Sequence, residues 1–409
     1  MSKARGRSRK YLKFRGLRLL SFGLVFFVFL ILVLRAIEKN YSHDEDRVIE
    51  TISGRELAKE AFKFLVVLHR PELVIEGTKC ASNDNCSAIK SINPVAAITW
   101  EMLGNAKQYE VTKDSEHLEN ISKLFSLFRR LPPSPYTPTR LEVNFSQLID
   151  AFKASKNLDI LKLITYHLQD IRTNVNTKGP LPYVSRGIMV SSLIAGALVD
   201  FYALSNSSEV YEFLKTSWLP KRYTEAEVQQ YRDSYRIAAK KIIDELRPSE
   251  ELRVGALQEV LPMNQQDFSC FIQLAKSKYY LATKEPEILN DLSYYFEEAD
   301  FKSKRADEFK FNVIQPALAC AETLKNILPL RPQLSEDLHE LISKFIISRF
   351  DYEKRPICIG DNGFLGTMGK GFSCEGATKL ISDSAWAVSI LSDLEMRFDV
   401  SARRISEGK

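Results

Sequence analysis

Three stretches of the chain repeat one local pattern, and this pattern decides the fold class. They read Tyr109-Glu-Val-Thr112-Lys-Asp114, Tyr202-Ala-Leu-Ser205-Asn-Ser207 and Tyr280-Leu-Ala-Thr283-Lys-Glu285. In each stretch a tyrosine near the end of an apolar helical segment is followed by a polar turn, and a glutamate comes seven residues after the tyrosine. Because an acid in the first turn favours the helix dipole, the pattern predicts a long apolar helix, a tight turn and an amphipathic return helix.

The rest of the body is also helical by its apolar spacing, and alternating strand patterns are nearly absent beyond residue 50. Capping boxes at Ser53-Gly-Arg-Glu56 and Thr224-Glu-Ala-Glu227 predict two of the helix starts. The repeated tyrosines are 93 and 78 residues apart, which argues against a simple solenoid. We expect helices at residues 54–69, 94–110, 115–129, 145–154, 157–171, 186–204, 208–218, 224–246, 267–282, 286–298, 309–327, 334–350 and 383–397.

The hairpin turns, together with Asp361-Asn-Gly-Phe-Leu-Gly366 and Ser382-Asp-Ser-Ala-Trp386-Ala-Val-Ser-Ile-Leu391, resemble the α/α-toroid superfamily. This superfamily includes the six-hairpin glycosidases and uronate lyases, and, as a second resemblance, the terpenoid-cyclase toroids. The resemblance covers most of residues 50–400. It implies an all-α, (α/α)6-type toroid of helical hairpins over residues 53–400, with the site on the longer loops that precede the inner helices.

The composition and the charge distribution limit which kinds of partner the chain can bind. Of 409 residues 45% are hydrophobic, which is enough for a large core, and 57 basic residues against 52 acidic ones give a net charge of +5. Eight of those bases lie in the first 18 residues, so the remainder carries 49 against 52. Because nucleic-acid binders usually carry an excess of positive charge and residues 19–409 do not, we expect no nucleic-acid partner.

The N-terminal region predicts a membrane anchor. Residues 19–34, LLSFGLVFFVFLILVL, carry no charge and are flanked by Arg18 and Arg35. We expect a transmembrane signal-anchor helix over 19–35, because the run is long for a cleaved signal peptide and no small-x-small site follows it. The positive-inside rule then makes 1–18 a cytoplasmic tail and places the linker 36–52, the body and the tail 401–409 outside the cytoplasm.

A second apolar segment, Gly187–Leu204, could be interpreted either as a buried helix of the body or as a second membrane span. Ser191, Ser192 and Asp200 inside it would make insertion in a bilayer costly. We therefore predict a helix packed on every side within the body.

Cysteines and sequons agree with an oxidising compartment. All six cysteines follow the anchor: Cys80, Cys86, Cys270, Cys320, Cys358 and Cys374. Short loops would be closed by the pairs Cys80–Cys86 and Cys358–Cys374, which leaves Cys270 to pair with Cys320. The alternative is that Cys270 and Cys320, which both lie in apolar helical stretches, are free buried thiols. No C-x-x-C occurs and the five histidines are scattered, so no metal site is expected. Asn-x-Ser sequons, which carry glycans if the organism glycosylates, are at Asn40, Asn85, Asn120, Asn144 and Asn206.

The loop 351–382 is the strongest candidate for a site. It holds six of the seventeen glycines, and a loop of this length without a helical pattern is usually functional or disordered. Sugar chemistry needs two carboxyl groups facing one bond, with aromatic faces beside them. Candidate acids and bases are Asp361, Glu375 and Asp383, and candidate stacking residues are Tyr183, Phe364, Phe372 and Trp386. Glu259 and Asp267 flank the preceding long loop, and both Asp267 and Asp383 also suit a helix start.

Other chemistries lack motifs. The chain has no G-x-S-x-G, P-loop, H-E-x-x-H or G-x-G-x-x-G sequence, and no aspartate-rich motif of a terpenoid cyclase. We expect no cofactor. The resemblance favours a protein that acts on or binds glycans, hydrolase-like or lyase-like, with a non-catalytic interaction scaffold as the alternative. A central funnel lined by two carboxyl groups about 5–10 Å apart would favour the enzyme. A central funnel plugged by apolar side chains would favour the scaffold.

Overall fold

A computed structural model provides the structure of the chain. It describes residues 47–65, 74–82, 85–91, 94–131, 144–220, 223–246, 265–297, 314–351, 363–367 and 378–403. Two compact units are present, one of Met1–Glu50 with Ser401–Lys409 and one of Thr51–Val400. Only the ends of two strands are described in the first unit, so the fold below is that of the second.

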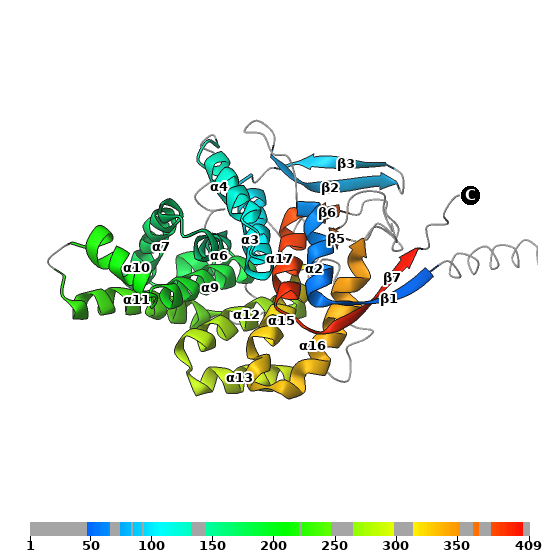
Figure 1. Cartoon of the computed structure of the whole chain (residues 1–409). Coiled ribbons are helices and arrows are strands. Elements are labelled where there is room, and N and C mark those ends of the chain that lie inside the picture. Colours follow the sequence, from blue (N-terminus) through cyan, green and yellow to red (C-terminus); the bar gives the residue numbers. More distant parts are fainter. Residues whose placement is uncertain are drawn as a thin grey trace, which may run out of the picture. The chain divides into compact units, whose positions relative to one another are not determined.

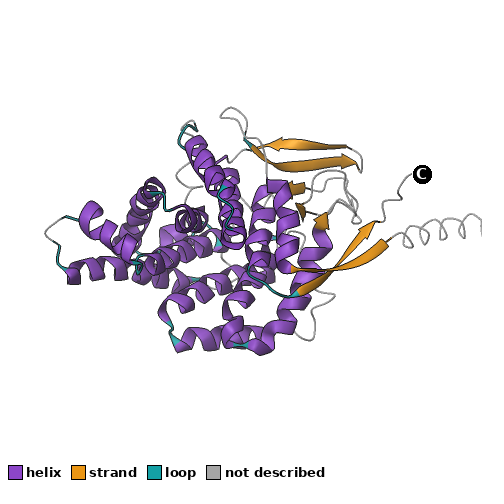
Figure 2. Cartoon of the chain, viewed as in Figure 1, coloured by secondary structure: helices purple, strands orange, loops and turns teal. Residues whose placement is uncertain are grey.

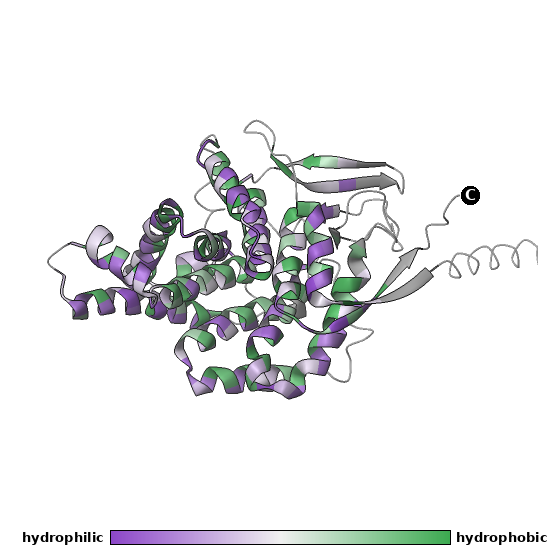
Figure 3. Ribbon diagram, viewed as in Figure 1, coloured by the Kyte–Doolittle hydropathy of each residue, from purple (hydrophilic) through white to green (hydrophobic). Residues whose placement is uncertain are grey.

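Six helices of the described residues form a closed inner ring. Figure 1 labels each of them. They are α3 (Pro94–Thr112), α6 (Phe145–Ser155), α9 (Ile188–Leu204), α12 (Gln265–Thr283), α15 (Gln315–Ile327) and α17 (Ile381–Ser392). Each helix packs against the next, and α17 packs back onto α3. Hydrophobic residues cover much of the inner helices α9 and α17, whereas α11 is largely hydrophilic (Figure 3). The ring is therefore the core of the molecule.

An outer helix packs against each inner one. These are α2 (Gly54–Phe62) on α17, α4 (Glu116–Phe128) on α3, α7 (Leu158–Lys178) on α6, α11 (Glu225–Glu245) on α9, α13 (Pro286–Glu297) on α12 and α16 (Ser335–Leu341) on α15. Shorter helical segments are η1 (Lys63–Leu65), α8 (Leu181–Val184), α10 (Ser208–Phe213), η3 (Leu214–Trp218), η4 (Leu328–Leu330), η5 (Pro332–Leu334), η6 (Ile342–Ile346) and η7 (Ile347–Arg349). The predicted toroid of six helical hairpins is confirmed.

The ring closes between the two ends of the unit. The backbone N–H of Gly54 donates to the carbonyl oxygen of Met396 at 2.8 Å. A Cβ on Gly54 would lie 2.8 Å from the Leu394 carbonyl oxygen, so a side chain does not fit. The strands β1 (Arg47–Ser53) and β7 (Arg397–Arg403) pair beside this contact, and the Thr51 hydroxyl donates to Asp399 Oδ1 at 2.9 Å. The first outer helix thereby completes a hairpin with the last inner helix.

A five-stranded sheet is the main feature that the all-α prediction missed (Figure 2). Its order is β3 (Asn85–Lys90), β2 (Ile75–Ser82), β6 (Thr378–Leu380), β5 (Gly363–Thr367) and β4 (Phe350–Asp351). The strands come from two loops far apart in sequence, and β6 leads directly into α17. A Cβ on Gly77 would lie 1.9 Å from the Lys379 carbonyl oxygen, so glycine permits the close approach of β2 to β6.

Two of the three predicted hairpin turns, at Thr112 and Thr283, share one hydrogen-bonding arrangement with a further turn at Ser155. In each of these a hydroxyl donates to the carbonyl four residues earlier and accepts from the N–H two residues later. The lysine that follows each hydroxyl has a left-handed backbone, with φ of 59°, 56° and 59° at Lys113, Lys156 and Lys284. This arrangement satisfies carbonyl and amide groups that a helix end leaves free. The predicted turn after Tyr202 differs, because the Ser205 hydroxyl donates to the Tyr202 carbonyl only three residues earlier.

One of these turns escaped the sequence pattern. The turn after α6 reads Phe152-Lys-Ala-Ser155-Lys156, with phenylalanine where the other turns have tyrosine. The ammonium of Lys156 lies 5.7 Å from the Phe152 ring centroid, as Lys284 lies 5.4 Å from Tyr280. The role of the aromatic residue is thus to present a ring face to the lysine, which either residue type can do.

Both predicted capping boxes are confirmed. The hydroxyls of Ser53 and Thr224 accept from the backbone N–H groups of Glu56 and Glu227, and each glutamate accepts in return. Two helices differ clearly from their predicted bounds at the C-terminal end. α7 continues to Lys178, seven residues beyond the predicted end, and α17 ends at Ser392, five residues before the predicted end, because Arg397 begins strand β7.

The predicted anchor 19–35 and its flanks 1–18 and 36–46 lie outside the described residues. Within the described ranges, no single helix has both the length and the apolar composition needed to cross a membrane. The pair Ile188–Leu204 and Ser208–Trp218 meets that test together, with a bend of 91° between its helices.

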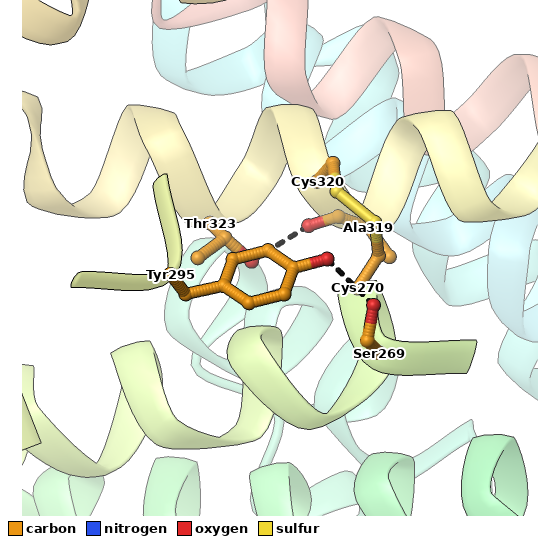
Figure 4. The surroundings of a disulfide bond; sticks show 6 residues. All are labelled: Ser269, Cys270, Tyr295, Ala319, Cys320 and Thr323. Atoms are coloured by element: carbon orange, nitrogen blue, oxygen red, sulfur yellow. Dashed lines mark hydrogen bonds between the residues drawn. A yellow bond between two sulfur atoms is a disulfide. The ribbon is translucent and has the colours of Figure 1, made fainter. Parts of the chain in front are cut away.

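A disulfide joins two neighbouring inner helices (Figure 4). Cys270 of α12 and Cys320 of α15 are fully buried, with Cα atoms 4.9 Å apart. Beside them the Ser269 and Tyr295 hydroxyls share a hydrogen bond of 2.5 Å. The predicted Cys270–Cys320 pair is confirmed.

The other two cysteine pairs stay predictions. Cys80 and Cys86 lie opposite each other in the β2–β3 register, although their side chains are outside the description. Directly opposed residues of antiparallel strands have Cα atoms about 4.5–5.5 Å apart, which suits a disulfide. Cys358 and Cys374 lie outside the described residues.

Candidate functional site

Two of the predicted site residues, Asp383 and Trp386, lie on α17, toward the end of the ring where the inner helices begin. We call this end of the ring the mouth. Asp383 lies in the first turn of α17 and is 1% exposed. Gln315, the first residue of α15, donates its Nε2 to Asp383 Oδ1 at 2.6 Å, and Ser382 Oγ lies 3.5 Å from the same oxygen. The carboxyl group is therefore held between two inner helices, at a helix start where the dipole favours negative charge.

Strand β5 packs over the start of α17. The backbone N–H of Phe364 donates to Ser384 Oγ at 3.1 Å, next to Asp383 in sequence. The Phe364 ring is fully buried against Phe350, with centroids 5.0 Å apart. Phe364 is thus near Asp383, but its ring packs in the core. The other predicted residues of this loop, Asp361, Phe372 and Glu375, lie outside the described residues.

Trp386 lies one helical turn below Asp383 and is 5% exposed. Its indole lies 5.5 Å from Trp100 of α3 and 6.2 Å from Phe271 of α12, measured between ring centroids. We call Trp100, Phe271 and Trp386 the aromatic layer. Because α12 and α17 are not neighbours in the ring, the contact between Phe271 and Trp386 crosses its interior.

Tyr183 lies apart from these residues, on α8 just before α9. It is 5% exposed, and its carbonyl oxygen accepts from Ser191 Oγ at 2.8 Å. The guanidinium of Arg186 stacks 4.9 Å from its ring centroid, and burial raises the pKa of the phenol. Asp267 is part of α12 but its side chain is not described, and Glu259 is outside the described residues.

Below the aromatic layer lies an ionic cluster that the sequence analysis did not predict. Lys278 Nζ of α12 lies 2.9 Å from Asp200 Oδ2 of α9 and 3.7 Å from Glu322 Oε1 of α15. Burial favours the neutral amine, but the two carboxylates raise the pKa of Lys278 above its usual range. Gly196 makes room for the lysine, because a Cβ there would lie 3.3 Å from Lys278 Cδ. We call Asp200, Lys278 and Glu322 the ionic cluster.

Hydrogen bonds extend this cluster across the ring. Ser146 of α6 donates to Asp200 Oδ2 at 2.7 Å, and Lys278 Nζ lies 3.4 Å from the same hydroxyl. Asp150, also of α6, pairs with Lys153 at 2.9 Å. Although burial opposes ionisation of Asp150, the neighbouring cations lower its pKa well below the usual range. In the sequence, such positions can be recognised as single charged residues within an otherwise apolar face of a helix.

The aromatic layer and the ionic cluster both bring side chains from non-neighbouring inner helices into contact inside the ring. In the ranges that the structure describes, no group of three or more His, Cys, Asp or Glu side chains is arranged to hold a metal ion.

Comparisons with known proteins agree with this fold. The chain is similar to a solved unsaturated glucuronyl hydrolase specific for heparin, with 11% identity, a TM-score of 0.52 and coverage of 83% of this chain and 96% of that one. It is also similar to the unsaturated glucuronyl hydrolase from Streptococcus agalactiae, with 10% identity, a TM-score of 0.52 and coverage of 83% and 90%.

No protein family matches the chain by sequence, and no curated protein matches it. The structural likeness thus defines the class: the chain has the six-hairpin glycosidase-like α/α-toroid fold. The resemblance inferred from the hairpin turns is confirmed at the level of the fold.

Proposed function

We propose that the chain binds a glycan at the mouth of its inner ring and processes it as a hydrolase-like or lyase-like enzyme. The observation that carries the proposal is Asp383, a buried carboxyl group at the mouth of a toroid whose solved neighbours are unsaturated glucuronyl hydrolases. A carboxyl group fixed by Gln315 is oriented for proton transfer to or from a bound sugar. Asp361 and Glu375, on the same loop region, are the candidates for the second carboxyl group.

The second candidate function is a non-catalytic scaffold on the same fold. The aromatic layer favours it, because apolar side chains occupy the ring interior where a deep funnel would otherwise lie. Sugar cleavage needs two carboxyl groups on opposite sides of one bond, whereas glycan recognition needs only a shaped mouth. Turnover, measured separately from binding, distinguishes the two candidates.

The test uses full-length protein in detergent with a panel of uronate-containing oligosaccharides, including unsaturated ones. We expect binding, and loss of turnover by about 10²- to 10⁴-fold in Asp383→Asn, because the amide cannot transfer the proton. Asp393→Asn is the matched control, since Asp393 follows the opposite end of α17 and pairs with Lys325 at 2.7 Å. Binding without turnover supports the scaffold, and equal activity of wild type and Asp383→Asn contradicts a catalytic role for this residue.

We also propose that the body is anchored in a membrane and lies outside the cytoplasm. The uncharged run 19–34 behind eight basic residues supports this orientation. The Cys270–Cys320 disulfide supports it independently, because disulfides persist mainly in oxidising compartments. Protease added to the cytoplasmic face of sealed membranes should leave residues 36–409 intact, and digestion of the body would contradict the orientation.

A further inference from the structure

The indole of Trp386 is fixed by a carboxylate from the neighbouring helix. Its Nε1 donates to Glu322 Oε2 at 2.6 Å. We propose that Glu322 is a positioning residue, which determines how Trp386 lies beneath Asp383 and so shapes the base of the mouth. This inference rests on the proposed glycan site and names the residue that holds it in shape from below.

Trp386 is well placed to form that base. Asp383 and Trp386 are three residues apart on α17, so their side chains share one face of the helix. Helical side chains lean toward the helix N-terminus, which brings the indole toward the turn that carries Asp383. The position of the indole therefore limits the space directly below the carboxyl group.

Packing alone leaves one property of the indole open. Trp100 lies against it at an interplanar angle of 31° and Phe271 at 51°, so the aromatic layer restricts the plane of the ring. An indole can still turn over within such a slot, which exchanges its N–H edge for its hydrocarbon edge. A carboxylate acceptor on one side selects one of these two orientations, because a buried indole N–H needs a partner.

Glu322 is itself held in place, and both of its carboxylate oxygens have partners. Oε2 accepts from Trp386, while Oε1 lies 3.7 Å from Lys278 Nζ. Lys278 is held in turn by Asp200 at 2.9 Å. Because Lys278 contacts Oε1, the other oxygen, Oε2, is held where it accepts from the indole N–H.

Two variants of Glu322 separate positioning from charge balance. Glu322→Asp keeps the charge beside Lys278 but withdraws the acceptor from the indole, whereas Glu322→Gln keeps an acceptor at full length and removes the charge. Lys325→Met is the matched control, because Lys325 lies one turn further along α15 and pairs with Asp393. The chain has three tryptophans, so 19F NMR of 5-fluorotryptophan protein resolves each one, with Trp386→Phe assigning the signal.

We expect Glu322→Asp to shift the Trp386 resonance and to weaken binding of the uronate oligosaccharides about tenfold, as the loss of one hydrogen bond would. Glu322→Gln should keep the resonance and the affinity close to wild type, and Trp218, bonded to Gln169 at 2.8 Å on the outer helices, should not move. In a Trp386→Phe background, Glu322→Asp should cause no further loss of affinity.

Three results would overturn the inference. They are an unmoved Trp386 signal in Glu322→Asp, a loss of affinity in Glu322→Gln but not in Glu322→Asp, and an equal loss in Lys325→Met. The NMR result is independent of the glycan. If no oligosaccharide binds the wild type, the proposed function fails, while the shift of Trp386 still decides whether Glu322 positions the indole.

Discussion

Replacing Lys278 by methionine tests the ionic cluster inside the ring. The substitution preserves the length of the side chain but removes the ammonium that lies 2.9 Å from Asp200 and 3.7 Å from Glu322. Two carboxylates, whose side chains are only 21% and 19% exposed, then remain without their cation. Removing one partner of a buried ion pair costs about 3–5 kcal/mol, and the partial exposure here places the expected loss near 3 kcal/mol.

Lys276→Met is the matched control on the same helix. Lys276 pairs with Asp291 at 3.3 Å, but that aspartate side chain is 62% exposed, so the pair should contribute no more than about 1 kcal/mol. Urea unfolding of the detergent-solubilised chain, followed by circular dichroism, measures both losses. The double variant Lys278→Met/Asp200→Asn should recover part of the stability, because it leaves one fewer uncompensated charge. Equal losses in Lys278→Met and Lys276→Met would refute the reasoning.

Three further predictions follow from the turns, the histidines and the sequons. Lys284→Gly should raise the free energy of unfolding by about 0.5 kcal/mol, measured by urea unfolding, because relief of the strained φ of 59° outweighs loss of the contact with the Tyr280 ring. Burial lowers the pKa of His117 and His167 below their unfolded values, so the unfolded chain binds more protons and stability should fall as the pH drops below about 6.5. Thermal melts at pH 7.5 and 5.5 check this, and replacing both histidines by glutamine should flatten the difference. In cells that glycosylate, glycopeptide mass spectrometry should find a glycan on Asn206, which is exposed and whose side-chain oxygen accepts from Arg232. It should find none on Asn144, which is 1% exposed.

Local signals in the sequence were sufficient for the helical hairpins. The capping boxes at Ser53 and Thr224 and the turns after Tyr109 and Tyr280 depend on residues within one helical turn of each other. Such features are predictable because their geometry is set by neighbours in sequence. The pair Cys270–Cys320, 50 residues apart, was reached differently, as the pair that remained if the other cysteines closed short loops.

Contacts between distant segments could not be predicted in this way. β2 and β6 pair Thr78 with Lys379, and neither strand shows an alternating pattern that would reveal it alone. The ionic cluster depends on which faces of α9, α12 and α15 meet inside the ring, which no single helix specifies. Asp383 was predicted correctly at a helix start, whereas the hydrogen bond between Glu322 and Trp386 joins two helices and could not be predicted from either one.

The central claim is that a glycan binds at the mouth of the inner ring, beside Asp383. An experimental structure of the full-length chain with a bound uronate oligosaccharide tests this claim most directly. We predict ligand density at the N-terminal ends of α15 and α17, with a sugar hydroxyl within hydrogen-bonding distance of Asp383. Density at the opposite end of the ring, beside the hairpin turns of Lys113 and Lys284, or an empty mouth at a saturating ligand concentration, would contradict it.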